Sequence, residues 1–324
     1  MGNIALWIGF TLGIAFLLAL DMGVLHRKAR ALSFREAATW SAIWISLAMI
    51  FAAGVFYHRG RVSGMEFLAG YIIELSLSVD NVFLFIVIFR YFGVPSRYQH
   101  RVLFWGILSA ILLRGAMIVA GAALIHRFHW VTYLFGAFLI FTGWKMFQSR
   151  EEAPDVGHSP VLRWLRRHLR ITSTIESQSF FTRIDGRLYA TPLFLVLALV
   201  ETTDVLFALD SIPAIFGITR DPFIVFTSNI LAILGLRSLY FLLSGVLELF
   251  QYLSTGLAFV LGFVGIKMLL TYWEIKIPIG ISLGVVGLIL GLSVLFSILR
   301  SRQESQQAMG AQEGPEPAEL AHVD

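Results

Sequence analysis

The sequence contains no cysteine among its 324 residues, which excludes disulfide bonds, thiolate metal ligands and catalytic thiols. Charged residues are also scarce at 14%, whereas 57% of the residues are hydrophobic. A soluble domain of this length could not bury so much apolar surface, so an integral membrane protein is expected. The sequence has no phosphate loop, dinucleotide fingerprint, nucleophile elbow or HExxH motif, so we do not expect an enzyme. Its net charge of +4 comes from loops between apolar stretches and indicates no nucleic-acid partner.

Nine apolar stretches have the length that a helix needs to cross a bilayer, about 20 residues. They predict an all-α polytopic membrane protein with spans at residues 4–25, 38–57, 68–89, 102–125, 129–148, 190–216, 222–247, 251–271 and 278–299. The first stretch has no basic residue before it and a basic cluster, residues 26–28, after it, which predicts a retained helix rather than a cleaved signal peptide. We therefore expect a transmembrane domain over residues 1–300 and a disordered cytoplasmic tail over 301–324, which is rich in Gln, Glu, Ala, Pro and Gly.

The basic residues predict the orientation of the spans. With the N-terminus outside and the C-terminus in the cytoplasm, most of the 25 Lys and Arg residues fall in cytoplasmic segments. The opposite side then carries only Arg59, Arg61, Arg127, Arg220 and Lys276. In the long cytoplasmic loop 149–189, residues 161–170 alternate apolar and basic side chains at helical spacing. Two interpretations fit this segment: a helix on the anionic inner leaflet, or an ordinary basic loop helix.

Two parts of the chain are related in sequence. Residues 79–93 align with 203–217, Leu113-Arg114 with Leu236-Arg237, and residues 142–146 with 264–268, with only single-residue gaps between them. Chance similarity of apolar helices explains the matching Leu and Phe residues, but poorly explains an ordered match of one Asp, one Arg and one Lys. Each copy holds three spans, an odd number, so the copies enter the membrane in opposite directions. This predicts two inverted three-helix repeats, at about 68–148 and 190–271, as in many secondary transporters.

Six carboxylates lie within the predicted spans, where each costs several kcal/mol unless it is paired or hydrated. Such a cluster predicts a site in the membrane where positive charge is bound or passed. With a neighbouring amide and hydroxyl, the candidate ligands are Asp21, Glu74, Asp80, Asn81, Glu201, Asp204, Asp210 and Ser211.

Helical spacing indicates which of these side chains converge. Glu74 and Asn81 share one face of their helix, and Asp80 is turned aside. Asp210 lies off the polar stripe of the second segment, but Pro213 is expected to break that helix, swing Asp210 inward and free carbonyl oxygens as ligands. A kink that serves packing alone is the other interpretation, and the adjoining Asp-Ser pair favours the break.

Four basic residues also lie within spans, and we favour their being counter-ions that balance the acidic helices. They are Arg114, Arg237, Lys145 and Lys267. The alternative is an oxyanion site in which the guanidinium groups bind a tetrahedral or pyramidal anion. Asp21 has two interpretations as well, a helix-end residue paired with a nearby basic side chain, or a gate carboxylate beside the main site.

The donor atoms restrict the ion. Carboxylate, amide, hydroxyl and carbonyl oxygens suit Mn²⁺, Mg²⁺ or Ca²⁺, whereas Cu⁺ and Zn²⁺ prefer thiolate and imidazole. All eight histidines fall in loops, at span ends or in the tail. Protons would compete with a metal for the same carboxylates, which offers a simple basis for exchange.

On these residues the sequence resembles the TerC/Alx family of bacterial integral membrane proteins, within the LysE-type exporter grouping. The resemblance covers all nine spans and rests on the segments 19–28, 74–81 and 201–213. The family is associated with tellurite resistance and with manganese homeostasis, in which its members look like Mn²⁺ exporters, and relatives are suggested to deliver metal to secreted proteins. The resemblance implies an inner-membrane location and an ion site at Asp21, Glu74, Asp80, Asn81, Glu201, Asp204 and Asp210.

The sequence thus predicts an inner-membrane secondary transporter that exports Mn²⁺, with Ca²⁺ as the other candidate ion, in exchange for protons. No permanently bound cofactor is expected, and the partners are the transported ion and the lipid bilayer. Two alternatives come from other classes. One is an assembly or metalation factor that binds secretion or insertion machinery, and the other is a tellurite or oxyanion resistance protein, in which Arg114 and Arg237 matter more than the carboxylates.

Overall fold

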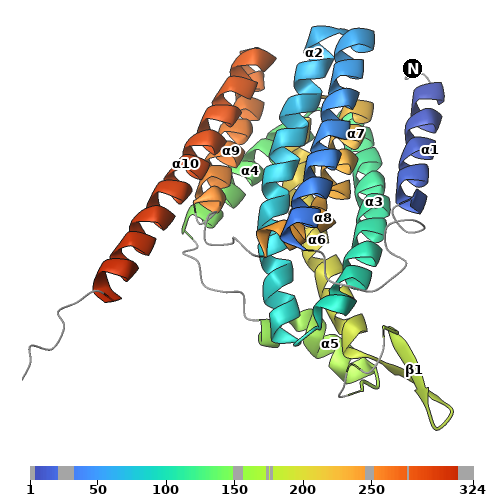
Figure 1. Cartoon of the computed structure of the whole chain (residues 1–324). Coiled ribbons are helices and arrows are strands. Elements are labelled where there is room, and N and C mark those ends of the chain that lie inside the picture. Colours follow the sequence, from blue (N-terminus) through green and yellow to red (C-terminus); the bar gives the residue numbers. More distant parts are fainter. Residues whose placement is uncertain are drawn as a thin grey trace, which may run out of the picture.

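Long apolar helices make up most of the computed structural model, which describes residues 4–20, 33–148, 156–172, 175, 178–244, 252–275 and 277–312 (Figure 1). The prediction of a helical, multi-pass membrane protein is confirmed. In chain order the elements are α1 (Ile4–Leu20), α2 (Phe34–Tyr91), α3 (Ser96–Arg127), α4 (Val131–Gln148), η2 (Val156–His158), α5 (Pro160–His168), β1 (Phe181–Ile184), β2 (Arg187–Ala190), α6 (Pro192–Phe216), α7 (Pro222–Leu234), α8 (Leu236–Leu243), α9 (Leu253–Leu270), η4 (Thr271–Trp273) and α10 (Ile279–Gln312).

Within the described residues, five helices are long and apolar enough to cross a bilayer: α2, α3, α6, α9 together with η4, and α10. The helices α7 and α8 are bent by 42° relative to each other and count together as a sixth. Both α1 and α4 occupy predicted span positions but are not among these six. The predicted number of nine spans is therefore not confirmed by length and composition.

The helix α2 contains two of the predicted spans and is interrupted between them. It starts with a capping box, in which the Ser33 hydroxyl accepts from the Glu36 amide at 3.3 Å and the Glu36 carboxylate accepts from the Ser33 amide at 3.0 Å. At Gly60 the backbone has φ 87° and ψ 175°, which strains any residue with a side chain. The two arms of α2 then lie side by side (Figure 1), and Phe67 and Tyr71 from the second arm share a buried cluster with residues 44–55 from the first.

Glycines bring α4 and α9 close together. A Cβ atom at Gly143 of α4 would lie 2.6 Å from the carbonyl oxygen of Ala258, and one at Gly265 of α9 would lie 2.6 Å from the carbonyl oxygen of Gly136. Backbones approach this closely in membrane proteins where small residues face each other, since van der Waals packing replaces the hydrophobic effect. The pair α4–α9 therefore depends on the absence of side chains at these positions.

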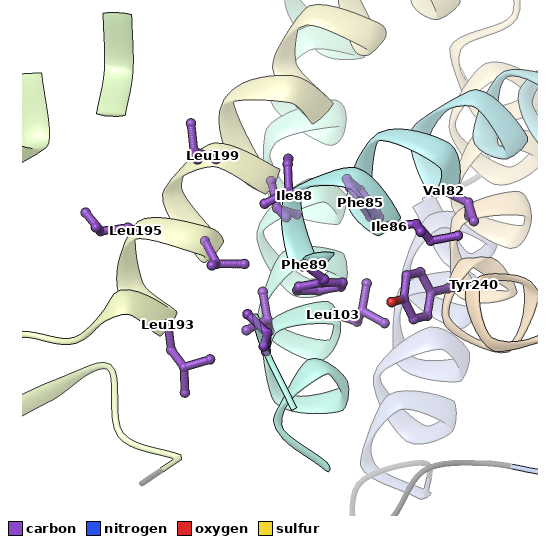
Figure 2. Close-up of a cluster of buried hydrophobic side chains, with 14 of the residues drawn as sticks. Val82, Phe85, Ile86, Ile88, Phe89, Leu103, Leu193, Leu195, Leu199 and Tyr240 are labelled. Atoms are coloured by element: carbon purple, nitrogen blue, oxygen red, sulfur yellow. The ribbon is translucent and has the colours of Figure 1, made fainter. Parts of the chain in front are cut away.

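A buried apolar cluster lies at the end of the bundle at which α2 ends and α3 begins. Val82, Phe85, Ile86 and Phe89 of α2 pack there against neighbouring helices, and Figure 2 shows them beside Leu103 and Tyr240. The same cluster includes the apolar face of α5, with Leu162 and Leu165 buried. The helix α5 thus uses its apolar face against the protein and leaves its arginines outside, which favours the loop-helix interpretation of residues 161–170.

Residues 181–190, at the end of the long loop, form a two-stranded antiparallel hairpin that the sequence analysis did not predict. Strands β1 and β2 pair from Phe181 with Ala190 to Ile184 with Arg187. The turn consists of Asp185 and Gly186, with φ values of 51° and 76°. An Asp-Gly turn of this kind favours a tight hairpin, so the signal was present in the sequence.

Two sequence predictions about helix ends were wrong. The helix α6 is continuous from Pro192 to Phe216, so Pro213 produces no break. In membrane helices a proline is tolerated where neighbouring helices, hydroxyl side chains or small local adjustments satisfy the freed backbone carbonyl. The helix α10 extends to Gln312, so residues 301–312 of the predicted disordered tail are helical, and residues 313–324 lie outside the described part of the chain.

The glycine contacts between α4 and α9 predict a position-specific effect on stability. We expect Gly143→Ala to lower the stability of the purified protein by about 1–3 kcal/mol, because the new methyl group meets a backbone oxygen that cannot move aside. Gly262→Ala on α9 is the matched control, since its Cβ would enter open space. Thermal unfolding in detergent measures both, and an equal change in the two variants would contradict the packing account.

Candidate functional site

A buried arginine joins two carboxylates inside the bundle. Arg114 of α3 donates from Nη2 to Asp204 Oδ1 of α6 at 2.9 Å and from Nε to Asp204 Oδ2 at 3.4 Å. Its Nη1 donates to Glu74 Oε1 of α2. The exposed fraction of each residue is 4% or less. A guanidinium in bidentate contact with one carboxylate and in contact with a second is a strong, geometrically specific arrangement.

Two neutral side chains complete this cluster. Asn229 of α7 donates its amide to Glu74 Oε2 at 2.8 Å, while its amide oxygen accepts from Arg114 Nη1 at 3.3 Å. Ser211 of α6 accepts from the same nitrogen at 3.3 Å. The Arg114 cluster therefore consists of Glu74, Arg114, Asp204, Ser211 and Asn229, and it joins α2, α3, α6 and α7. With both carboxylates ionised, its formal charge is −1.

A second polar group, the Asp80 group, follows on the same arm of α2. Asp80 Oδ1 accepts a hydrogen bond from Ser254 of α9 at 2.9 Å. Its other oxygen, Oδ2, is buried and has no hydrogen-bond partner among the described residues, and the same is true of Ser78 Oγ and of both amide atoms of Asn81. Native proteins leave few buried polar atoms unpaired, so this group of oxygens calls for a partner that the described part of the chain does not supply.

Two other predicted acidic residues in the described part of the chain bond partners outside these groups, although Glu201 lies close enough to Asp204 to interact with it electrostatically. The Glu201 carboxylate accepts a hydrogen bond from Ser109 of α3 and is only partly buried. Asp210 is partly exposed, accepts a hydrogen bond from Thr142 and lies near Lys145 of α4. The prediction that a helix break carries Asp210 into the main site was wrong, because α6 remains regular there.

The remaining predicted residues have varied surroundings. Asp21 lies outside the described residues. Arg237 is 6% exposed in α8. Lys267 of α9 lies near Glu66 of α2, whose carboxylate also accepts from Thr219 at 2.8 Å. The expected single constellation is thus divided among several separate groups, and no group of three His, Asp or Glu side chains close enough to hold a metal occurs in the described part of the chain.

Four polar residues in these groups were missed by the sequence analysis. They are Ser109, Asn229, Ser254 and Glu66. Asn229 had a detectable signal, because an amide in the middle of an apolar stretch is costly unless it is bonded. The serines had none, since a serine in a membrane helix usually bonds its own backbone.

The buried groups are closed, whereas one end of the bundle is open. The cavity beside Asp204 measures only about 10 Å³, roughly the space of one water molecule. A polar pocket of about 370 Å³ lies where α2 ends and α3 begins, and its lining includes Arg90, Ser96, Gln99 and Ser244. The apolar residues Ile86 and Phe89 line this pocket on the side of the cluster in Figure 2.

Comparison with known proteins gives consistent matches over almost the whole chain. The family described as "Integral membrane protein TerC family" matches residues 59–305. "Uncharacterized membrane protein STKORF319" of Myxococcus xanthus is 52% identical, over 93% of this chain and 94% of the relative. "Putative membrane-bound redox modulator Alx" of Salmonella typhi is 49% identical, over 95% of this chain and 98% of the relative. No solved structure matches.

The Arg114 cluster predicts a strong dependence on its only arginine. We expect Arg114→Gln to lower stability by about 3–5 kcal/mol, because two buried carboxylates then face each other without a cation. Adding Asp204→Asn should recover part of that loss by removing one charge. Thermal unfolding in detergent tests this, with Arg97→Gln at an exposed position of α3 as the control. Additive destabilisation in the double variant would contradict the ion-pair account.

Proposed function

The chain belongs to the TerC family of integral membrane proteins, and on this premise we propose that it is a transporter of divalent cations that exports Mn²⁺ across the inner membrane in exchange for protons. Calcium is the second candidate cargo, since both ions accept oxygen ligands and differ mainly in the cavity size and flexibility that they require.

The observation that carries this proposal is the presence of three unpaired oxygens within residues 78–81, of which Asp80 Oδ2 comes from a different face of α2 than the other two. Ser78 Oγ, Asp80 Oδ2 and Asn81 Oδ1 are buried on one arm of α2 and lack partners within the part of the chain that the structure describes. An unpaired buried polar group costs about 1–3 kcal/mol, so several neighbouring ones are retained for a reason other than stability. A hydroxyl, a carboxylate and an amide carbonyl are hard donors of the kind that Mn²⁺ and Ca²⁺ accept.

The Arg114 cluster has a different role in this proposal. Glu74 and Asp204 already share a cation, the guanidinium of Arg114, so in this conformation they are not available to a metal. Arg114 balances the carboxylates while the site is unloaded. A divalent ion that reaches Asp80 acquires a second carboxylate only when Arg114 releases one.

Helix packing supports the inverted repeats that belong to this proposal. The repeat alignment equates Gly143 with Gly265 and Gly136 with Ala258. The two close contacts between α4 and α9 are Gly143 with Ala258 and Gly265 with Gly136, so exchanging the repeats converts one contact into the other. A two-fold axis relating the repeats produces this reciprocity. With α2 taken as two helices and α7–α8 as one, we propose nine spans.

The alternatives have less support from the site. An oxyanion site needs an available guanidinium, but Arg114 is bound by two carboxylates. The relatives named as redox modulators raise a further possibility, yet this sequence has no cysteine, so it cannot act through its own thiols. Because Mn²⁺ is a redox-active metal, its export would connect the name redox modulator with the transport function proposed here. An assembly factor that uses the basic loop 149–189 is the second candidate function, favoured by the arginines exposed on α5.

Metal flux into proteoliposomes tests the proposal. We expect saturable Mn²⁺ uptake with the native chain and a loss of at least about tenfold with Asp80→Asn or Asn81→Leu, since each removes an oxygen ligand. The matched control is Asp185→Asn in the hairpin turn, where Asn tolerates the left-handed backbone. Equal flux in all four proteins would place the ion site elsewhere.

Deletion of residues 149–189 separates the transporter from the assembly factor. Flux should persist in the deletion variant if the loop is accessory to transport. If the native chain moves no Mn²⁺ or Ca²⁺, and partners captured by the native chain are lost on deletion, the assembly-factor function replaces the one proposed.

A further inference from the structure

The two repeats carry equivalent residues with different hydrogen bonds. The alignment equates Asp80 with Asp204, and it equates Ser254 of α9 with Thr132 of α4. Asp80 is bonded by Ser254, its neighbour from the other repeat. Asp204 is bonded instead by Arg114, and the Thr132 hydroxyl is buried without a partner among the residues that the structure describes. Of two equivalent hydrogen bonds, the one from Ser254 to Asp80 is therefore present, whereas the one from Thr132 to Asp204 is not formed.

The two ends of the bundle also differ at equivalent positions, because one end has a pocket and the other has a tight contact. The polar pocket of about 370 Å³ includes Ser244, which the alignment equates with Gly121. At Gly121 there is no room, because a Cβ atom there would lie 3.0 Å from the ring of Phe216. Phe92, the counterpart of Phe216, does not line the pocket.

These two places lie at opposite ends of the bundle. The pocket reaches Ser96 at the start of α3, and Gly121 lies 25 residues further along the same helix. At 1.5 Å per residue this separates them by about 37 Å, more than the thickness of the hydrocarbon core. The structure is thus open at one end and closed at the equivalent place of the other.

We infer that Asp80 and Asp204 exchange partners between two states of the protein, and that this structure is one of them. In the other state the Thr132 hydroxyl donates a hydrogen bond to Asp204. Arg237, the counterpart of Arg114, forms an ion pair with Asp80 in that state. The pocket at Ser244 closes and its counterpart at Gly121 opens. The inference rests on the transport function proposed above, and it identifies the side chains that change partners during transport.

The exchange gives the transporter a simple means of coupling access to charge. In each state an arginine neutralises one aspartate, while the other aspartate keeps an oxygen for the cargo. A cation bound to Asp80 excludes Arg237 from it, so the change of access requires the cation to leave Asp80. Only interactions that differ between the two states can shift their equilibrium. The hydrogen bonds and ion pairs of Asp80 and Asp204 are such interactions.

Single cysteines report the two states without interference, since the chain has none of its own. Ser244→Cys marks the open pocket. Ala214→Cys marks its closed counterpart, because Ala214 is buried and is equivalent to Arg90 of the pocket lining. In nanodiscs both faces are accessible to a membrane-impermeant maleimide. The cysteine at 244 should react readily in the otherwise native chain, and the one at 214 slowly.

Conservative substitutions of the two hydroxyl donors should shift these rates in opposite directions. Ser254→Ala weakens the state seen here, so labelling at 214 should rise roughly tenfold and labelling at 244 should fall, as expected for the loss of a hydrogen bond to a charged group. Thr132→Val weakens the other state and should slow labelling at 214 by a similar factor. The arginine variants Arg114→Gln and Arg237→Gln should repeat this opposition with larger changes.

Labelling requires no transport, so the two proposals can fail separately. If the labelling rates shift in opposite directions in a chain that moves no Mn²⁺, the exchange of partners is supported and the proposal that Mn²⁺ is the transported ion is wrong. Normal Mn²⁺ flux with labelling that shifts in the same direction, or not at all, in Ser254→Ala and Thr132→Val would overturn the exchange and leave the transporter.

Discussion

A guanidinium shared by two carboxylates in the interior of an apolar bundle is the interaction on which this structure depends. Arg114, Glu74 and Asp204 come from three helices, and Asn229 adds a fourth. Ionised groups in a low-dielectric interior are tolerated only when each has its partners in good geometry. The cluster therefore fixes the rotation and depth of all four helices, since a shift of one would leave a buried charge unpaired.

Sequence analysis located the three charged residues of this cluster but missed Asn229, and it could not assign their partners. Helical spacing shows which face of a helix a side chain occupies, and this was sufficient to place Glu74 and Asp204 in the interior. It does not show which neighbouring helix that face meets. For this reason Glu201, which shares a stripe with Asp204 in the sequence, bonds Ser109 instead of joining the Arg114 cluster.

The helix positions were well predicted, and the errors at their ends have local causes. The interruption of α2 lies at Gly60, where the backbone adopts a conformation that a side chain would strain, and the sequence analysis placed a loop there. The expected break at Pro213 did not occur, because a membrane helix tolerates a proline when its neighbours satisfy the freed backbone carbonyl. Composition predicted disorder beyond residue 300, but α10 simply continues as polar helix.

Charge balance explains why an arginine occupies an acidic site in a protein proposed to carry cations. A divalent ion requires about two carboxylates, and Asp80 supplies one beside neutral oxygens. Without Arg114, the empty site would hold Glu74 and Asp204 as two uncompensated charges, which would either bind a cation too tightly to release it or prevent folding. A tethered cation that competes with the cargo avoids both outcomes, because the carboxylates exchange one partner for another and are never exposed alone. Such competition needs a position to which the arginine can withdraw, so the neutral oxygens of Ser211 and Asn229, which already contact its Nη1, are as necessary to the site as the carboxylates themselves.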